Sequence, residues 1–198
     1  MTRPQARSRT RSADVTDSLL DAAIELLEEG GPPAITVRSV ATRAGVAPMG
    51  VYSRFGSKDG LLEALFVHGF DGLHEAITGA SGADSLARLR RGCAAYRSFA
   101  LAHPHLYELM FRQMLELELS AESLERAEQT FAELVSRVAD AMAAGLLARG
   151  DEVDTAQQIW NAMHGAVSLE LAGVTFSTNP ERTFASMLDT MLAGLRHP

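Results

Sequence analysis

The stretch from residue 36 to residue 62 constrains the fold of this 198-residue chain more than any other, because two short apolar patterns flank a glycine turn in it. Thr36 is suited to cap a helix with its hydroxyl group, and apolar residues recur after it at helical spacing. Gly45 follows where the chain must turn, since a residue without a Cβ enters a left-handed conformation at little cost. Pro48 suits the first turn of a second helix, which we expect to end near Phe55. The inward residues of the first helix are Val37, Val40, Ala41 and Ala44.

The outer side of the second helix is too polar and too small to belong to a core. An α-helix fits the major groove of B-DNA, and a helix-turn-helix unit presents the N-terminal part of its second helix to the base edges. Arg38 is placed to reach a guanine edge or a phosphate, while Tyr52, Arg54 and Lys58 are candidate phosphate ligands. The alternative is an ordinary helical hairpin with solvated basic residues, which has no need of this turn chemistry. The expected DNA-contacting residues are Thr36, Arg38, Ala47, Pro48, Met49, Gly50, Tyr52, Ser53, Arg54 and Lys58.

The segment from residue 14 to residue 66 resembles the DNA-binding domain of TetR-family transcriptional regulators. The resemblance rests on an Ala-x-x-Ala-Gly-Val motif followed by Tyr, Phe and Lys at the family's spacing, and on the preceding helix LLDAAIELLEEGG. One position departs: Ala47 stands where the family usually has Ser or Thr, so the second helix lacks a side-chain cap worth about 1 kcal/mol. The motif residues are Ala41, Ala44, Gly45, Val46, Tyr52, Phe55 and Lys58.

The rest of the sequence favours an all-α protein of about nine helices, since Leu, Ala, Glu and Arg dominate and strict alternation is scarce. We expect a flexible basic arm at residues 1–13, a helix-turn-helix DNA-binding domain of three helices at 14–60, and a helical-bundle ligand-binding and dimerisation domain at 61–198. The arm either enters a minor groove or is a disordered tail. Helices are expected near residues 12–29, 57–78, 105–114, 120–148 and 154–176, and from 180 onward, with another between 84 and Pro104.

Charge and cysteine content restrict the function further. The net charge is −7, but residues 1–60 hold eight Lys and Arg against seven Asp and Glu, so the acidity belongs to residues 61–198. The lone Cys93 excludes an internal disulfide or a cysteine zinc cluster and indicates a reducing compartment. No apolar run approaches the roughly 18 residues of a membrane helix. We expect a cytoplasmic protein without membrane contact.

Nothing in the sequence supports an enzyme. No HExxH motif, phosphate loop or nucleophile elbow occurs, so neither a cofactor nor a metal is expected. The alternative, a metal-dependent enzyme on a helical scaffold, would have to use scattered histidines, namely His68, His74, His103, His105 or His164.

The predicted bundle is rich in Met and aromatic side chains, which suit a cavity for an irregular apolar guest but would equally fill a solid core. Trp160, His164 and Gly165 form a Trp-x-x-x-His-Gly pattern that resembles a signature of one TetR subgroup. His164 is accordingly either a ligand contact or an internally bonded core group. The candidate ligand-binding residues are Phe66, Phe70, Tyr96, Phe99, Tyr107, Met110, Phe111, Met114, Trp160, Met163 and His164.

The last two predicted helices carry apolar residues on wide faces, which favours a four-helix contact between two copies of the chain. The alternative is that both faces pack internally. The predicted interface residues are Val167, Leu171, Val174, Phe184, Met187, Leu188, Met191, Leu192 and Leu195.

The family resemblance implies a homodimeric repressor of a palindromic double-stranded operator that a small, largely apolar effector releases. Two recognition helices of such a dimer lie about 34 to 36 Å apart, one turn of DNA. A transcriptional activator, or a nonspecific DNA-binding protein of the same fold, is the alternative.

Overall fold

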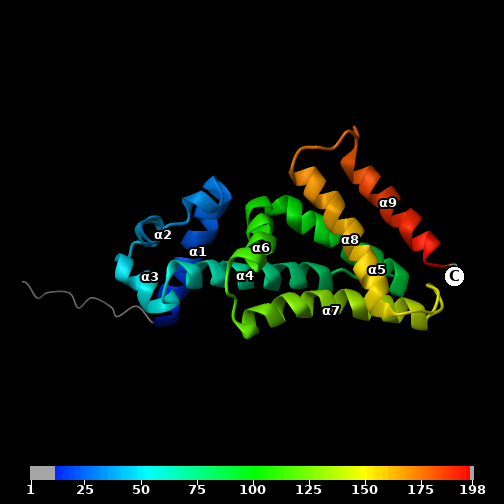
Figure 1. The fold of residues 1–198 in the computed structure, drawn as a ribbon, viewed down its shortest axis with the longest axis horizontal. Helices are drawn as coiled ribbons and strands as arrows, with labels where there is room; N and C mark the ends of the chain where they lie inside the picture. Colours follow the sequence, from blue (N-terminus) through cyan, green and yellow to red (C-terminus); the bar gives the residue numbers. More distant parts are fainter. Residues whose placement is uncertain (1–11, 197–198) are drawn as a thin grey trace, which may run out of the picture.

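The computed structural model describes residues 12–196, except for the side chains of residues 12, 13 and 113–115. Over this range the chain forms nine α-helices and no strand, which confirms the predicted all-α class. The molecule is elongated: α1–α3 pack at one end of the long helix α4, α5–α7 pack along the remainder, α8 packs on α5 and α7, and α9 packs on α8 (Figure 1). We call α1–α3 the head and α5–α9 the body. The arginines of the predicted basic arm lie outside the described residues, as does the side chain of Met114.

The head forms as the local sequence signals predict. It contains α1 (Ser12–Gly30), a 3-10 turn (Pro32–Ala34), α2 (Val37–Arg43) and α3 (Pro48–Phe55). The Thr36 hydroxyl accepts a hydrogen bond from the Ser39 N–H at 3.0 Å, and the Ser39 hydroxyl accepts one from the Thr36 N–H at 3.0 Å. This reciprocal capping box satisfies two N–H groups that a helix start leaves without partners. Gly45 adopts a φ of 69°, and no side chain caps α3 at Ala47.

Helix α4 (Lys58–Thr78) connects the head to the body and packs against both, so that their buried residues form one continuous core. Its N-cap is Ser57, whose hydroxyl accepts from the Gly60 N–H at 3.0 Å. The body helices are α5 (Ser85–Ala102), α6 (Pro104–Glu116), α7 (Ala121–Ala143), α8 (Glu152–Leu171) and α9 (Pro180–Gly194). In Figure 1, α7 runs alongside α4, and α8 and α9 form an adjacent pair at the end far from the head.

Two helices are shorter than predicted, because glycines inside the predicted ranges end them. Helix α7 ends at Ala143 instead of Ala148: Gly145 adopts a φ of 69°, and the Leu146 N–H bonds back to the Ala141 carbonyl at 2.9 Å. Helix α8 ends at Leu171 instead of Phe176, because Gly173, with a φ of 68°, makes the same kind of turn. Such turns provide hydrogen-bond donors to backbone carbonyls that have no partner within the helix at its C-terminal end.

Hydrogen bonds join α4 to α7 near both ends of α7. At the head end, the Glu63 carboxylate accepts from the Ser120 N–H at 2.8 Å and the Ser123 hydroxyl at 2.6 Å. These bonds hold the pKa of Glu63 below its usual range. At the far end, the Arg137 guanidinium donates to the Ile77 carbonyl at 2.7 Å. A displacement of α7 would therefore act directly on α4.

Candidate functional site

The outward face of α3 is left uncovered by the rest of the subunit. Met49 is 71% exposed and Tyr52 is 48% exposed, while Val51 on the inner side is fully buried. Gly50 is small because it packs close to the chain that precedes α3: a Cβ there would lie 3.3 Å from a methyl group of Val46. As a result, the N-terminal end of this short helix has small side chains and an accessible surface. Ala47, Pro48, Ser53 and Arg54 complete this exposed face.

Basic groups lie on both sides of this helix. Arg38 is exposed in the first turn of α2, and Lys58 is exposed at the first residue of α4. Arg43 is different: it forms ion pairs with Glu25 at 3.0 Å and Glu29 at 2.6 Å, and these raise its pKa above the ordinary value. Arg43 therefore joins α2 to α1. Thr36 is exposed, but its hydroxyl is engaged in the capping box.

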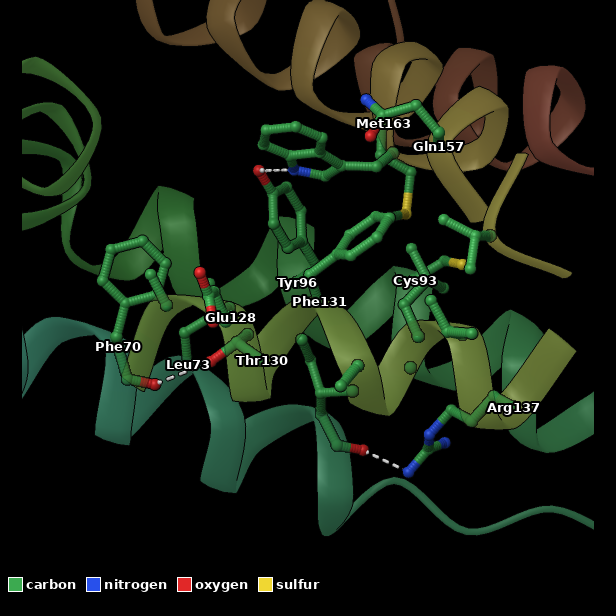
Figure 2. Close-up of a pocket in the computed structure, with 18 of the residues that line it drawn as sticks. Phe70, Leu73, Cys93, Tyr96, Glu128, Thr130, Phe131, Arg137, Gln157 and Met163 are labelled. Atoms are coloured by element: carbon green, nitrogen blue, oxygen red, sulfur yellow. Dashed lines mark hydrogen bonds between the residues drawn. The ribbon is translucent and has the colours of Figure 1, made fainter. Parts of the chain in front are cut away.

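A cavity of about 590 Å³ lies within the body, between α4, α5, α7 and α8 (Figure 2). This volume falls within the roughly 300 to 1,000 Å³ of typical small-molecule sites. Five predicted ligand residues line it, namely Phe70, Tyr96, Phe111, Trp160 and Met163. Sequence reasoning missed most of the rest of the wall, including Leu73, Ile77, Leu89, Cys93, Thr130, Phe131, Leu134, Val135 and Arg137.

The other predicted ligand residues with described side chains do not line the cavity. Phe66 and Met110 are fully buried in the core, and Met110 lies so close to Gly69 that a Cβ there would meet it at 2.6 Å. Phe99 packs against His103, with ring centroids 5.1 Å apart. Tyr107 and His164 stand behind the wall. We therefore remove these five residues from the candidate ligand site.

A hydrogen-bonded chain behind the wall fixes the position of Tyr96. The Tyr96 and Tyr107 hydroxyl oxygens are 2.7 Å apart, and the Tyr107 oxygen is 2.7 Å from Nδ1 of His164. Burial lowers the pKa of His164, which favours the neutral ring, and the donor in its bond with the Tyr107 hydroxyl is set by the tautomer of that ring. Burial also raises the pKa of Tyr96 to about 12, so this hydroxyl stays protonated. The structure thus favours an internally bonded His164 over a ligand contact.

Four predicted interface residues are buried inside their own subunit, which corrects that part of the prediction. Val167, Phe184, Leu188 and Leu192 retain at most 6% of their surface, because α8 and α9 pack against the body through them. Leu171, Met187, Met191 and Leu195 are half-buried, and Val174 is exposed. Leu169 and Phe176 are exposed beside them, and Phe176 is fully solvent-accessible. We use the name α8–α9 outer face for the apolar residues of α8, α9 and the loop between them that stay partly or fully exposed, namely Leu169, Leu171, Val174, Phe176, Met187, Met191 and Leu195.

Two classes of site are absent from the described part of the chain. Residues 12–196 contain no group of three or more His, Cys, Asp or Glu side chains placed to hold a metal ion. Among the same residues, no helix combines the length and hydropathy needed to cross a bilayer.

A capped first helix, a glycine turn and an exposed second helix, joined to a hollow helical body, define a helix-turn-helix protein with a separate ligand-sized cavity. The family model for bacterial regulatory proteins of the tetR family matches residues 19–65. The model for the tetracyclin repressor-like C-terminal domain matches residues 89–191, about half of the chain. The chain therefore belongs to the TetR family of DNA-binding transcriptional regulators.

Individual relatives agree with this assignment. The chain is 28% identical over 98% of its length to an uncharacterized HTH-type transcriptional regulator of Mycobacterium tuberculosis, of which it covers 89%. It is 41% identical over 80 residues, 39% of this chain and 41% of the relative, to the HTH-type transcriptional regulator BetI of Burkholderia cenocepacia. A protein of unknown function from Rhodococcus sp. RHA1 has a similar structure, with a TM-score of 0.87, 27% identity and coverage of 98% and 100% of the two chains. The TetR-family regulator PfmR of Thermus thermophilus shares the fold, with a TM-score of 0.67 at 20% identity over 89% and 98% of the chains.

Proposed function

We propose that this TetR-family regulator is a repressor that binds a palindromic operator as a homodimer and leaves it when a small, largely apolar effector enters the body cavity. One observation carries the proposal: α4 supports the head at one end and forms part of the cavity wall with Phe70, Leu73 and Ile77. A ligand that changes the tilt of α4 changes the separation of the two heads in the dimer. The ligand acts only if its affinity differs between the two arrangements.

Within this proposal, residues 14–60 bind DNA and residues 61–198 bind the effector and the second subunit. Helix α4 begins at Lys58, so the first turn of this connecting helix belongs to the DNA-binding part. The protein acts in the cytoplasm, where its operator is found, and has no enzymatic step. The predicted DNA contacts are supported by the exposure of α3 and by the basic side chains beside it.

The test is operator affinity at one fixed salt concentration, with the operator first located by footprinting the DNA that flanks the gene. Arg38→Ala, and the double variant Tyr52→Phe with Lys58→Ala, should each weaken binding about tenfold, because each removes contacts worth about 1 to 3 kcal/mol. Arg149→Ala removes the same charge from an exposed loop of the body and should leave binding unchanged. Sedimentation should show all variants as dimers.

Unchanged operator affinity in both head variants would contradict the assigned DNA surface. A ratio near one between operator and random-sequence DNA would instead contradict specific repression, because nonspecific binding rests on phosphate contacts alone.

A further inference from the structure

The charges around the body cavity restrict the chemistry of its ligand. Only two of the described side chains that line the cavity carry charge, Glu128 and Arg137 (Figure 2). The remaining polar residues of the wall are neutral. Burial raises the pKa of the Cys93 thiol to about 12, so it contributes no thiolate. The ligand therefore meets one acidic and one basic group at most.

Arg137 is not available to bind a ligand. Its NH1 group donates to the carbonyls of Ala80 and Arg88 at 3.1 and 2.8 Å. Its NH2 group donates to the carbonyls of Ile77 and Thr78 at 2.7 and 3.4 Å. A guanidinium has five N–H donors, and these four bonds leave only the one at Nε.

The fifth donor of Arg137 is occupied as well, because Nε donates to Glu133 at 2.7 Å. The Glu133 carboxylate also neutralises the charge of the guanidinium, and Arg137 as a whole is only 8% exposed. Gly92 leaves room for this arrangement, since a Cβ at residue 92 would lie 3.2 Å from NH1 of Arg137. Arg137 therefore closes the far end of the cavity and offers nothing to an anion.

Glu128, unlike Arg137, has a charged group that is available to a ligand. It is an exposed residue of α7 that lines the cavity, and among the side chains that the structure describes no hydrogen bond or ion pair engages its carboxylate. Figure 2 shows Glu128 between Phe70 and Tyr96, at the opposite end of the cavity from Arg137. A ligand at this end meets an uncompensated negative charge.

The end of the cavity that holds Glu128 is aromatic. Phe70 and Phe111 have ring centroids 5.7 Å apart, and Phe131 and Trp160 have centroids 6.0 Å apart. Aromatic rings attract organic cations through their negative faces, and the attraction strengthens where water is displaced. Near Arg137 the lining is aliphatic: Arg137 donates to the Ile77 carbonyl, and Leu134 and Val135 lie within one turn of it on α7.

We propose that the effector is a cationic amphiphile, an organic ammonium whose head lies beside Glu128 among the aromatic rings and whose apolar tail extends toward Arg137. This inference rests on the proposed function, because it names the chemical class of the molecule that releases the operator. Burial of the tail supplies most of the affinity. The carboxylate and the rings select the sign of the charge, and an anionic ligand meets a guanidinium whose five donors are all engaged.

Trp160 is the only tryptophan of the chain and lines the aromatic end, so its fluorescence reports on occupancy. The probes are decyltrimethylammonium, 1-decanol and decanoate, each built on a chain of ten carbons and titrated below its micelle concentration or solubility limit. The ammonium should bind about tenfold more tightly than the alcohol, because aromatic rings attract a cation and not its neutral analogue. Decanoate should bind more weakly than both.

Glu128→Gln keeps the shape of the side chain and removes its charge. It should weaken decyltrimethylammonium binding about fivefold, the scale of a partly exposed ion pair, and leave 1-decanol unaffected. Glu125→Gln is the matched control, because it removes the same charge one turn away on α7 from a residue outside the cavity wall. Calorimetry should give one site per chain.

Equal or tighter binding of decanoate or 1-decanol, equal effects of the two variants, or no binding of any probe would each overturn the inference. Operator affinity measured on the same samples reports separately on the proposed function. If 1-decanol or decanoate binds the cavity at least as tightly as decyltrimethylammonium and releases the operator, the proposed regulatory function holds and the cationic class of effector is wrong. If no molecule bound in the cavity changes the operator affinity, the proposed release of the operator by an effector is contradicted.

Discussion

Gly45 and Gly165 both have open space where a Cβ would stand, yet their backbones differ. Gly45 adopts a φ of 69°, which an L side chain enters only at a cost, whereas Gly165 lies inside helix α8. Gly45→Ala should destabilise the protein by about 1 kcal/mol. Gly165→Ala should stabilise it by up to about 1 kcal/mol, because alanine has the higher helix propensity. Urea unfolding followed by circular dichroism measures both changes, and equal shifts would contradict the conformational account.

At the residue scale, local chemistry was predictable and the direction of large side chains was not. The Thr36 cap, the Gly45 turn and the missing cap at Ala47 depend on residues within one turn of the chain, so the sequence contains their causes. Phe66 and Phe70 lie one helical turn apart on α4 and share an apolar pattern. Phe66 nevertheless packs into the core, and Phe70 lines the cavity, because the packing of the surrounding helices differs between the two levels.

At the element scale, the contact between α4 and α7 makes stability depend on pH. The hydrogen bonds from Ser123 and Ser120 lower the pKa of Glu63 in the folded state, so the unfolded state takes up the proton at a higher pH. The stabilisation is therefore complete above the unfolded pKa and is lost as pH falls through the folded pKa. Glu63→Gln should cost about 1 kcal/mol at pH 7, and much less once the pH falls below the range in which Glu63 ionises.

Urea denaturation of the two proteins across this acidic range measures the effect. Glu122→Gln is the control, since Glu122 is an exposed residue in the first turn of α7. A difference between wild type and Glu63→Gln that stays constant with pH would show that the carboxylate charge is not the cause.

Helix starts could be predicted from nearby residues, whereas helix stops depend on contacts that are distant in the sequence. The starts of α3, α4 and α9 follow proline or serine signals that a single sequence carries. The stops of α7 and α8 were placed too late because the chain offers several glycines, and tertiary packing decides which of them turns. Leu124 shares the helical spacing of the buried apolar residues of α7 but is 38% exposed, since it lines a cavity that no periodic pattern reveals.

At the scale of the whole molecule, the α8–α9 outer face is the apolar surface that a second copy would cover. Leu169 and Val174 are both about half exposed, and apolar side chains that gather on one exposed face mark a surface that a partner buries. The double variant Leu169→Glu with Val174→Glu should be monomeric in sedimentation experiments, because association would bury four added charges in each dimer. Met49→Glu places a charge on an equally apolar but distant residue of α3, and it should remain dimeric.

Operator binding then distinguishes the two surfaces. A dimer holds both heads on one operator, so the second head binds at a high effective concentration, and losing this coupling should weaken binding by about 10² to 10⁴. The Leu169→Glu, Val174→Glu monomer should therefore lose operator affinity by that factor while its head stays folded and binds a single half-site weakly. Met49→Glu should lose both half-site and full-operator binding, since it alters the helix that contacts DNA. Full affinity in a monomer would mean that one head suffices, and the link between effector, α4 and head separation would then have no basis.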